Sequence, residues 1–402
     1  MMNPRDLDDA LLSSLLGRSR SLFADDIEAN RAAMTDVLRG KRLLIAGAAG
    51  SIGQAFVKQL LPFAPGALHL ADLNENMLVE LVRDLRSGNI SLPSDFATYS
   101  IDVTGPEFIA MAEGAGPFDM FLNFSALKHV RAERDPYSLM RMIEVNVEAL
   151  ARYLDHPASR TLTRAFSVST DKSVRPENLM GATKNLMERI LLAHSDRLSA
   201  NSARFANVAF SAGSLLEGFE CRLAKQQPIA APSDVKRYFI SHAEAGQLCL
   251  LGACLCKTRE VVFPKLEPEE HLISFETIAR AYLAHHGLDP LLCADEAEAK
   301  ARFKDRPAKA WPCVFSASDT TGEKLAEEFL RPGDKPDLSR FKEVGVVEEV
   351  LPDRALLDAF LCDVAALRQQ GRWTKEALRH LIERAVPDLV HEERGKSLDQ
   401  KM

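Results

Sequence analysis

The sequence of 402 residues predicts an α/β fold in which a doubly wound parallel sheet makes up the larger part. Short apolar runs alternate with helical patterns from residue 41 to about Val208, as expected for strands joined by crossover helices. A glycine-rich turn joins the first apolar run to the first helix, and an acidic residue ends the second run. After Val208 the alternation becomes looser, which indicates a smaller C-terminal domain.

The first predicted strand, Lys41–Gly47, runs directly into the turn Gly47-Ala48-Ala49-Gly50-Ser51-Ile52-Gly53, and a helix follows. Strand, glycine turn and helix in this order are typical of a Rossmann-like dinucleotide site. Gly47 permits the tight turn, Gly50 lets a pyrophosphate approach the backbone, and Gly53 lets the helix pack against the strand. The N–H groups at the start of the helix, at Ser51 and Ile52, would face the phosphates.

The second predicted strand, Ala67–Leu73, carries Asp72 near its end, 19 residues after Gly53. At this spacing a carboxylate accepts hydrogen bonds from the ribose hydroxyls of a dinucleotide. A 2′-phosphate beside Asp72 would be repelled, and Asn74 brings no positive charge to hold one. The pattern therefore favours NAD over NADP, and a glycine-rich loop beside an unrelated surface aspartate is the alternative interpretation.

Further segments complete the predicted sheet and its helices. They are the helix Met77–Arg86, the strands Thr98–Val103 and Phe118–Ser125, the helix Met140–Leu154 and the strand Ala165–Ser169. Asp102 and Val103 lie at the end of the third strand, where they are candidates for contacts with adenine. A turn acid at the end of a strand accounts for Asp102 equally well.

The stretch that follows the strand Ala165–Ser169 places three polar residues at the edge of the sheet. Thr170, Asp171 and Lys172 come just past the carboxyl end of this strand, where open α/β sheets bind their ligands. From the residues alone, a solvated surface ion pair between Asp171 and Lys172 is the simpler interpretation, because most adjacent pairs of this kind are exposed.

The predicted domain organisation has three parts. They are an N-terminal helical arm at residues 1–40, a dinucleotide-binding domain at 41–213 to which 236–264 returns, and a C-terminal region at 214–402. Within the last two parts, the predicted elements are the strands Lys236–Ile240 and Glu260–Phe263 and the helices Ala243–Cys256, Leu356–Arg368 and Thr374–Val386.

The composition indicates an ordinary globular protein, with 46% apolar and 27% charged residues. A net charge of −7 without a long basic run argues against nucleic acid and anionic membranes as partners. The longest apolar runs, such as Leu248–Cys256, are too short to span a bilayer, and the N-terminus has no pattern of a secretion signal. The seven cysteines show no paired framework and no metal-site spacing, so we expect free thiols in a cytoplasmic protein.

Several motifs resemble one known family. They are GAAGSIG at Gly47–Gly53, SALKHV at Ser125–Val130, STDKSVRPENLMGATK at Ser169–Lys184, ARFANV at Ala203–Val208, KRYFI at Lys236–Ile240 and, more weakly, TGEKLAEEF at Thr321–Phe329. The chain resembles the nucleotide-sugar 4,6-dehydratases of the extended short-chain dehydrogenase/reductase superfamily, which act on UDP-N-acetylglucosamine in polysaccharide biosynthesis. The resemblance covers roughly residues 11–330, and the Ser169–Lys184 block is its most specific part.

The resemblance implies an NAD-binding domain and a smaller C-terminal domain that holds a UDP-sugar. In the family reaction the C4 hydroxyl is oxidised, water is eliminated across C5 and C6, and the hydride returns to C6, so NAD is recycled. By this resemblance the protein is a lyase, a hydro-lyase that forms a UDP-4-keto-6-deoxy sugar. The fold usually pairs through helices, so we also expect a homo-oligomer.

The resemblance further assigns roles to the polar stretch. Thr170 would hydrogen-bond the C4 hydroxyl, Asp171 would protonate the leaving C6 hydroxyl, and Lys172 would remove the C5 proton, which favours catalysis over the surface ion pair. Lys184 would hold the nicotinamide ribose. Met180 takes the place of the tyrosine that most short-chain dehydrogenases carry four residues before the lysine, and a thioether transfers no proton.

Four residues are implied as substrate contacts, namely Lys128, Met180, Asn207 and Arg237. For Lys128 a solvated loop lysine is an equal alternative, and Asn146 is either a support for the active-site backbone or an ordinary buried asparagine. The chain departs from the family at Phe210 and Ala212, where a glycine and an arginine are usual, and at Thr320, where the family has an arginine. These departures leave the nucleotide open.

Three functions compete. A 4,6-dehydratase is the first, a nucleotide-sugar epimerase or reductase on the same scaffold is the second, and a non-catalytic NAD-binding protein is the third. The absence of a tyrosine at Met180 and of arginines at Ala212 and Thr320 motivates the last.

Overall fold

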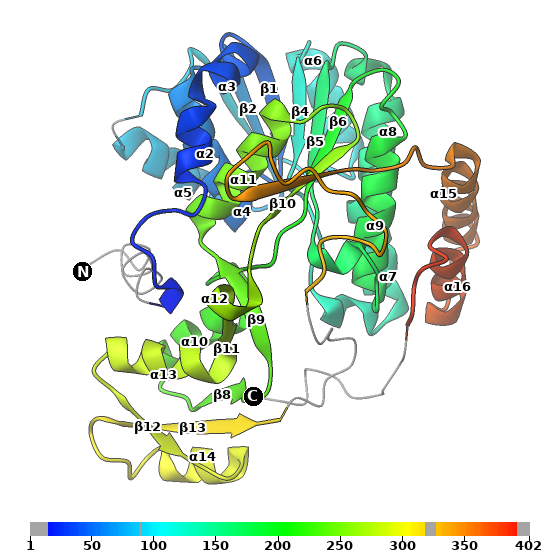
Figure 1. Cartoon of the computed structure of the whole chain (residues 1–402). Coiled ribbons are helices and arrows are strands. Elements are labelled where there is room, and N and C mark those ends of the chain that lie inside the picture. Colours follow the sequence, from blue (N-terminus) through cyan, green and yellow to red (C-terminus); the bar gives the residue numbers. More distant parts are fainter. Residues whose placement is uncertain (1–14, 89, 318–326, 392–402) are drawn as a thin grey trace.

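A computed structural model describes residues 15–88, 90–317 and 327–391 of the chain. Its main feature is a sheet of eight strands (Figure 1). In spatial order the strands are β3 (Asp95–Ser100), β2 (Ala67–Asp72), β1 (Arg42–Ala46), β4 (Met120–Asn123), β5 (Arg164–Val168), β6 (Ser199–Ala203), β10 (Glu260–Pro264) and β14 (Val344–Glu348). All neighbours pair in parallel except β10 and β14. The strand order reverses between β1 and β4, which confirms the predicted doubly wound sheet.

Helices cover both faces of this sheet (Figure 1). One face carries α2 (Ala24–Ala29), α3 (Arg31–Leu38), α4 (Ser51–Leu60), α5 (Glu75–Ser87) and α11 (His242–Leu255), with the short turn η1 (Leu61–Phe63). The other face carries α6 (Pro106–Ala115), α7 (Pro136–Ile143), α8 (Ala149–Asp155), α9 (Leu179–Leu192), α15 (Arg354–Gln369) and α16 (Lys375–Ala385), with η2 (Val130–Glu133), the π-helix η3 (Glu144–Glu148), η4 (Pro157–Ser159) and η5 (Asp171–Ser173).

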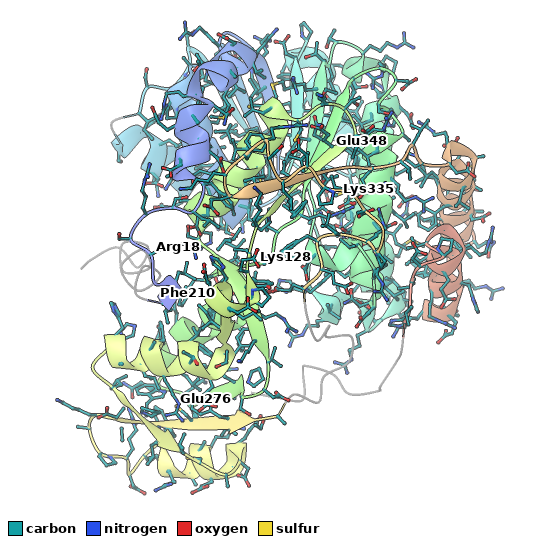
Figure 2. All side chains as sticks on the ribbon, in the orientation of Figure 1. Arg18, Lys128, Phe210, Glu276, Lys335 and Glu348 are labelled. Atoms are coloured by element: carbon teal, nitrogen blue, oxygen red, sulfur yellow. The ribbon has the colours of Figure 1, made fainter. Side chains whose placement is uncertain are left out.

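A smaller part lies beside the carboxyl edge of the sheet and contains Phe210 and Glu276 (Figures 1 and 2). Two three-stranded sheets form it, one of β7 (Asn207–Val208), β9 (Lys236–Ile240) and β11 (Leu272–Ser274), the other of β8 (Ile229–Pro232), β13 (Ala310–Ser316) and β12 (Asp289–Leu292). Its helices are α10 (Leu215–Ala224), α12 (Pro268–His271), α13 (Phe275–His285) and α14 (Glu296–Arg302).

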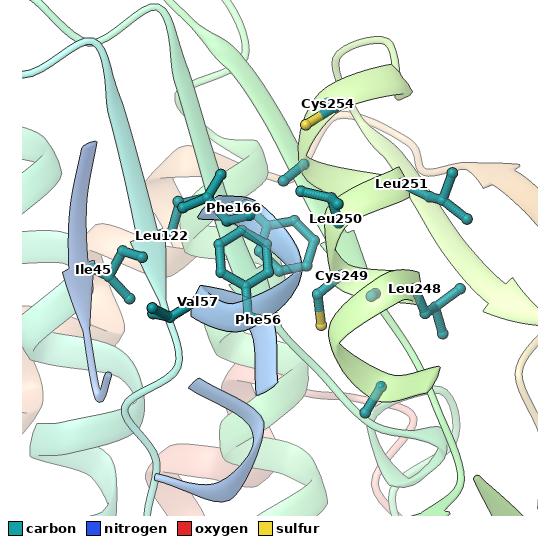
Figure 3. Close-up of a cluster of buried hydrophobic side chains, with 14 of the residues drawn as sticks. Ile45, Phe56, Val57, Leu122, Phe166, Leu248, Cys249, Leu250, Leu251 and Cys254 are labelled. Carbon is teal, nitrogen blue, oxygen red and sulfur yellow. The ribbon is translucent and has the colours of Figure 1, made fainter. Parts of the chain in front are cut away.

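The apolar runs of the sequence explain why the sheet is buried on both faces. Along β1, Leu43 and Ile45 face the α4 and α11 layer, whereas Leu44 faces the α7 to α9 layer. Alternate residues of a strand point to opposite faces, so a strand covered on both sides is apolar throughout. Figure 3 shows the first layer, where Phe56 of α4 and Cys249 of α11 are drawn within one buried cluster.

The C-terminal residues do not form a single body, although the sequence placed 214–402 in one region. Strand β14 extends the large sheet, and α15 and α16 bury Leu357, Phe360 and Ile382 in the same apolar cluster as α7 and α9. Conversely, β9 lies in the smaller part, so within 236–264 only α11 and β10 return to the large sheet. No helix in the described ranges combines the length and the apolar character that crossing a bilayer requires.

Candidate active site

The glycine turn lies at the reversal of strand order. Gly47 has a φ of +72°, and a Cβ atom there would lie 2.5 Å from the backbone nitrogen of Ser125, just past β4. A Cβ at Gly53 would lie 2.3 Å from the carbonyl oxygen of Gly47. A side chain at Gly47 would push the turn away from β4, and a side chain at Gly53 would push α4 away from the turn. The sequence prediction of a tight turn and a closely packed helix is therefore explained by backbone contacts.

Gly50 differs, because a Cβ there would meet only the Gly47 carbonyl oxygen, at an ordinary 3.4 Å. It precedes the first residue of α4 and has no side chain to cap the helix. The first turn of α4, with the N–H groups of Ser51 and Ile52, is thus open to an anion in the way that a pyrophosphate site requires.

Asp72 ends β2 beside this turn. Its carboxylate accepts hydrogen bonds from the backbone N–H groups of Ala49 and Asn74, both at 2.9 Å. These bonds hold the acid and the glycine turn together and leave further lone pairs on the carboxylate for ribose hydroxyls. The position and environment fit the sequence prediction for the ribose site.

Asp102 makes the contacts of an acid in a turn at the end of a strand, which is one of its two interpretations from the sequence. Its carboxylate accepts from the N–H and hydroxyl groups of Thr104 and pairs with Arg141. Burial alone would raise the pKa of Asp102, but the bonds from Thr104 and Arg141 hold it below its ordinary value. Val103 lines a small hollow together with Asn123 and Val145, and its contact with adenine stays a prediction.

The turn η5 brings the three polar residues together. Thr170 donates its hydroxyl to Oδ1 of Asp171 at 2.7 Å, and Nζ of Lys172 lies 3.3 Å from the same oxygen. Asp171 is 2% exposed, whereas a quarter of the Lys172 side chain reaches solvent. Asp171 and Lys172 do form an ion pair, as one interpretation of the sequence expects. Its carboxylate is buried, however, so it differs from a solvated surface pair.

The start of helix α9 is capped by a group that the sequence analysis missed. The buried Glu133 of η2 accepts from the N–H groups of Leu179 (3.0 Å) and Met180 (3.1 Å), the first two residues of the helix. Burial raises the pKa of Glu133, and the two N–H donors oppose that rise. A Cβ at Gly181 would lie 2.4 Å from the carbonyl oxygen of Lys172, so only glycine lets the turn pack this closely on α9.

Lys184 is buried on α9, 4% exposed. Among the described residues, the contact recorded for its ammonium is the thioether of Met187 at 3.1 Å, which is a weak acceptor. Burial lowers the pKa of Lys184 to about 8. A buried ammonium without a strong acceptor fits the predicted role of donor to ribose hydroxyls. Met180, by contrast, packs in the apolar cluster of α7 and α9, and its contact with substrate stays a prediction.

Asn146 lies in the π-helix η3 and is fully buried. Its side-chain amide accepts from the N–H of Leu127 (2.8 Å), donates to the carbonyl of Leu127 (3.0 Å) and donates to the hydroxyl of Thr183 (2.9 Å). The structure therefore gives Asn146 the backbone-support role. It fixes the segment that presents Lys128, whose exposed side chain lies where the two parts of the molecule meet (Figure 2).

A buried ionic network lies behind the turn. The hydroxyl of Ser173 donates to Glu188 at 2.9 Å, and Arg204 binds Glu188 and Glu349 at 2.6 Å each. Arg204 is 0% exposed. These partners could not be predicted from the sequence, because they come from η5, α9, the residue after β6 and the residue after β14.

Asn207 and Arg237, the other predicted substrate contacts, lie on β7 and β9. The side-chain amide of Asn207 lies 2.5 Å from Oε1 of Glu327, and the N–H of Tyr238 donates to Oε2 of Glu327 at 2.7 Å. Arg237 is buried and donates to the carbonyl of Lys236. Glu327 is a second group that the sequence analysis missed.

Of the two departures after β7, Phe210 takes an apolar role and Ala212 is exposed. Phe210 adopts a positive φ of 54° and packs 5.9 Å from the ring of Tyr282 in the core of the smaller part. The segment Thr320–Leu325, where the family arginine is missing, lies outside the described residues. The described residues hold no group of three His, Cys, Asp or Glu side chains placed to bind a metal ion.

Comparison with known proteins assigns a family to this arrangement. A family model described as polysaccharide biosynthesis protein matches residues 43–349. The chain is 28% identical over 321 residues to an uncharacterised membrane protein of Methanocaldococcus jannaschii, covering 78% of this chain and 87% of that protein. It is 27% identical to the capsular polysaccharide biosynthesis protein CapD of Staphylococcus aureus, over 62% of this chain but only 41% of CapD.

A further relative and a solved structure carry names with a reaction. The chain is 25% identical over 239 residues to an inverting UDP-N-acetylglucosamine 4,6-dehydratase of Campylobacter jejuni, covering 57% of this chain and 68% of the enzyme. A crystal structure of DesIV, a dTDP-glucose 4,6-dehydratase of Streptomyces venezuelae with NAD bound, aligns with a TM-score of 0.53 at 17% identity, over 72% of this chain and 88% of DesIV. The second likeness shows the fold.

Proposed function

The chain belongs to the polysaccharide biosynthesis protein family, and on that premise we propose that it is an NAD-dependent nucleotide-sugar 4,6-dehydratase acting on UDP-N-acetylglucosamine. The observation that carries the proposal is the buried Asp171, which contacts both Thr170 and Lys172 at the carboxyl edge of the sheet. The match to a dehydratase of that substrate supports the choice of sugar nucleotide.

The residues present fit NAD. Gly50, Ser51 and Ile52 would hold the pyrophosphate, Asp72 the adenosine ribose, and Lys184 the nicotinamide ribose. When bound, NAD supplies hydride transfer, which oxidises the sugar at C4 and later reduces it at C6.

The pair of Asp171 and Lys172 contains the acid and the base that dehydration needs. In this scheme Lys172 starts as the ammonium and Asp171 as the carboxylate of the ion pair. Transfer of a proton from Lys172 to Asp171 across the 3.3 Å contact gives a neutral amine and a carboxylic acid. The amine then removes the C5 proton of the 4-keto sugar, and the acid protonates the C6 hydroxyl, which leaves as water. The elimination restores the ion pair. Oxidation of C4 also releases the proton of its hydroxyl group, and C5 takes up one proton when the hydride returns to C6. Lys172 would exchange both protons with solvent water, so the whole reaction neither gains nor loses a proton.

Thr170 has a second task in this scheme. Its hydroxyl donates to Asp171 at 2.7 Å, and its oxygen lies within reach of the Lys172 backbone N–H at 3.4 Å. The hydroxyl can therefore orient the C4 hydroxyl of the sugar while it keeps Asp171 in place. Lys128, Asn207 and Arg237 would contact the nucleotide and sugar from the smaller part and the loop after β4.

The test is product analysis by mass spectrometry. The purified chain with NAD and UDP-N-acetylglucosamine should give a product lighter by one water, with deuterium at C5 when the reaction runs in D2O. Lys172→Ala should abolish this product while NAD still binds, whereas Lys300→Ala, which removes an exposed lysine of α14, should match the wild type. If no UDP- or dTDP-sugar loses water, the proposal is wrong, and a product of unchanged mass would indicate an epimerase.

A further inference from the structure

The residues 327–331, here called the strap, join the two parts of the molecule beside the candidate site. Glu327 binds Asn207 of β7 and the backbone of Tyr238 in β9. Glu328 pairs with Arg175, just after η5, at 3.6 Å. The strap therefore contacts the smaller part through one glutamate and the loop after the polar turn through the next.

The strap is also anchored in the buried network. The carbonyl oxygen of Phe329 accepts from Arg204 at 3.2 Å, and Arg331 at the end of the strap pairs with Glu349. Arg204 binds Glu188, which in turn accepts from Ser173 of the polar turn. The strap and the turn thus share one fixed anchor, which sets where Glu327 lies relative to Asp171.

The carboxyl group of Glu327 lies among charged groups of the site. Those that act on it are Asp171 and Lys172 of η5 and Arg237 of β9, and the phenol of Tyr238 is affected by it in turn. Burial and the negative charge of Asp171 raise the pKa of Glu327 to about 8. Asp171 is buried and Glu327 is half-buried. A carboxyl group that is partly desolvated beside a negative charge ionises less readily, so it keeps its proton at a higher pH.

We infer that Glu327 is a positioning residue of the proposed dehydratase, which orients Asn207 and completes a carboxyl pair with Asp171 beside the base Lys172. This inference rests on the proposed function. While Glu327 holds its proton, the site carries one negative carboxylate. Ionisation of Glu327 adds a second negative charge where the reaction develops negative charge on the sugar at C5, so turnover should fall as Glu327 loses its proton.

The first test is the dependence of kcat/KM on pH. From pH 7 to pH 9 a group with a pKa near 8 passes from mostly protonated to about one-tenth protonated. The decline of kcat/KM over this range should therefore be about tenfold smaller in Glu327→Gln than in the wild type. Lys184 titrates in the same range but is present in both proteins, so its effect cancels. Glu327→Ala should lose activity at pH 7, and Glu327→Gln should restore most of it.

Glu328→Gln is the matched control, since it removes a neighbouring charge of the strap whose partner is half exposed. Its pH profile should follow the wild type. If Glu327→Gln has the same pH profile as Glu328→Gln, the inference is overturned. Should Glu327→Gln not fold, Glu327→Asp serves instead, because a shorter carboxyl keeps the charge and should retain the alkaline decline while raising KM.

The second test needs no turnover, so it separates this inference from the proposed function. Glu327 has a raised pKa in the folded chain, so it binds more protons folded than unfolded between about pH 4.5 and 8. The wild type should therefore lose thermal stability relative to Glu327→Gln as pH rises through this window. A difference in Tm that stays constant from pH 5 to pH 8.5 would refute the inference even if the dehydratase reaction is found. Conversely, if the chain dehydrates no sugar but its stability shows this decline, the interaction of Glu327 with Asp171 stands and the role of Glu327 in dehydration is refuted.

Discussion

Replacing Arg204 by methionine should destabilise the protein strongly, because it removes the cation that two buried carboxylates share and leaves Glu188 without an ion-pair partner. Arg204 is 0% exposed, and the side chains of its partners Glu188 and Glu349 are 2% and 7% exposed. Glu349 keeps its ion pair with Arg331, whereas Glu188 keeps only hydroxyl donors, those of Ser173 and Ser169, among the hydrogen bonds recorded for its carboxylate.

The size of the effect follows from burial. Breaking a buried ion pair by removing one partner costs about 3–5 kcal/mol, because an uncompensated charge stays in a medium that solvates it poorly. At 1.4 kcal/mol for each factor of ten, the unfolding equilibrium should shift by about two to three and a half orders of magnitude. Arg302→Met on α14 removes an exposed ion pair with Glu298 and should cost about 0.5 kcal/mol or less.

Urea unfolding of both variants measures this difference, and its pH dependence identifies the cause. Burial would raise the pKa of Glu188, but Arg204 and the hydrogen bonds around it hold that pKa below its ordinary value. In the wild type this contribution is present at pH 7 and is lost as pH falls. In Arg204→Met the carboxyl can take up a proton instead, so the gap between the two proteins should narrow from pH 7 to pH 5. A gap no larger than that of Arg302→Met, or one independent of pH, would refute the reasoning.

Three further predictions concern the cofactor site and its support. Gly53→Ala should lower the stability of the cofactor-free protein, because its Cβ would lie 2.3 Å from a backbone oxygen. Gly50→Ala should leave that stability unchanged and weaken NAD binding. Calorimetry that finds equal NAD affinity in Gly50→Ala and the wild type would contradict the assignment of the pyrophosphate site. Affinity for NAD should fall as pH rises through about 8, where Lys184 loses its charge. Lys184→Met should remove this dependence on pH. If NAD affinity falls equally with pH in both proteins, Lys184 is not part of the site. Asn146→Ala should lower the free energy of unfolding by about 2–4 kcal/mol and lower kcat/KM, because it leaves the N–H and C=O groups of Leu127 without partners. Thermal or urea unfolding measures this loss. A variant with wild-type stability would show that water replaces the amide.

The large sheet was predictable because its signals are local. Strand β1, the glycine turn and α4 follow each other without interruption, and strands covered on both faces read as continuous apolar runs. Strand β14 was not predictable in the same way. Its five residues pair antiparallel with β10, a partner far away in sequence, and they stand between charged segments that resemble loop. The small sheet of β8, β12 and β13 was missed for the same reason.

The same distinction between local and distant contacts decides which site residues could be predicted. Thr170, Asp171, Lys172 and Lys184 lie within one short stretch, so the sequence placed them together at the edge of the sheet. Glu327 lies 120 residues from Asn207, and Glu133 is 46 residues from the helix start that it caps. No spacing rule links such residues. The glutamates of the Thr321–Phe329 motif were visible only as a weak echo of the family, without a role.

The position of Met180 decides which residues are left to move protons. Its thioether is packed in an apolar cluster on α9 and has no proton to give. Of the titratable groups that the structure describes around the polar turn, Glu133 caps the helix and Glu188 is bound to Arg204. In the proposed reaction, proton transfer would therefore fall to Lys172 and Asp171. Thr170 would be the hydroxyl that orients them, and Glu327 the neighbouring carboxyl. With Met180 in place of a tyrosine, the proposed reaction needs its acid and its base close together in one turn. The close approach of the Lys172 backbone to Gly181 holds this turn against α9, the helix that carries Met180.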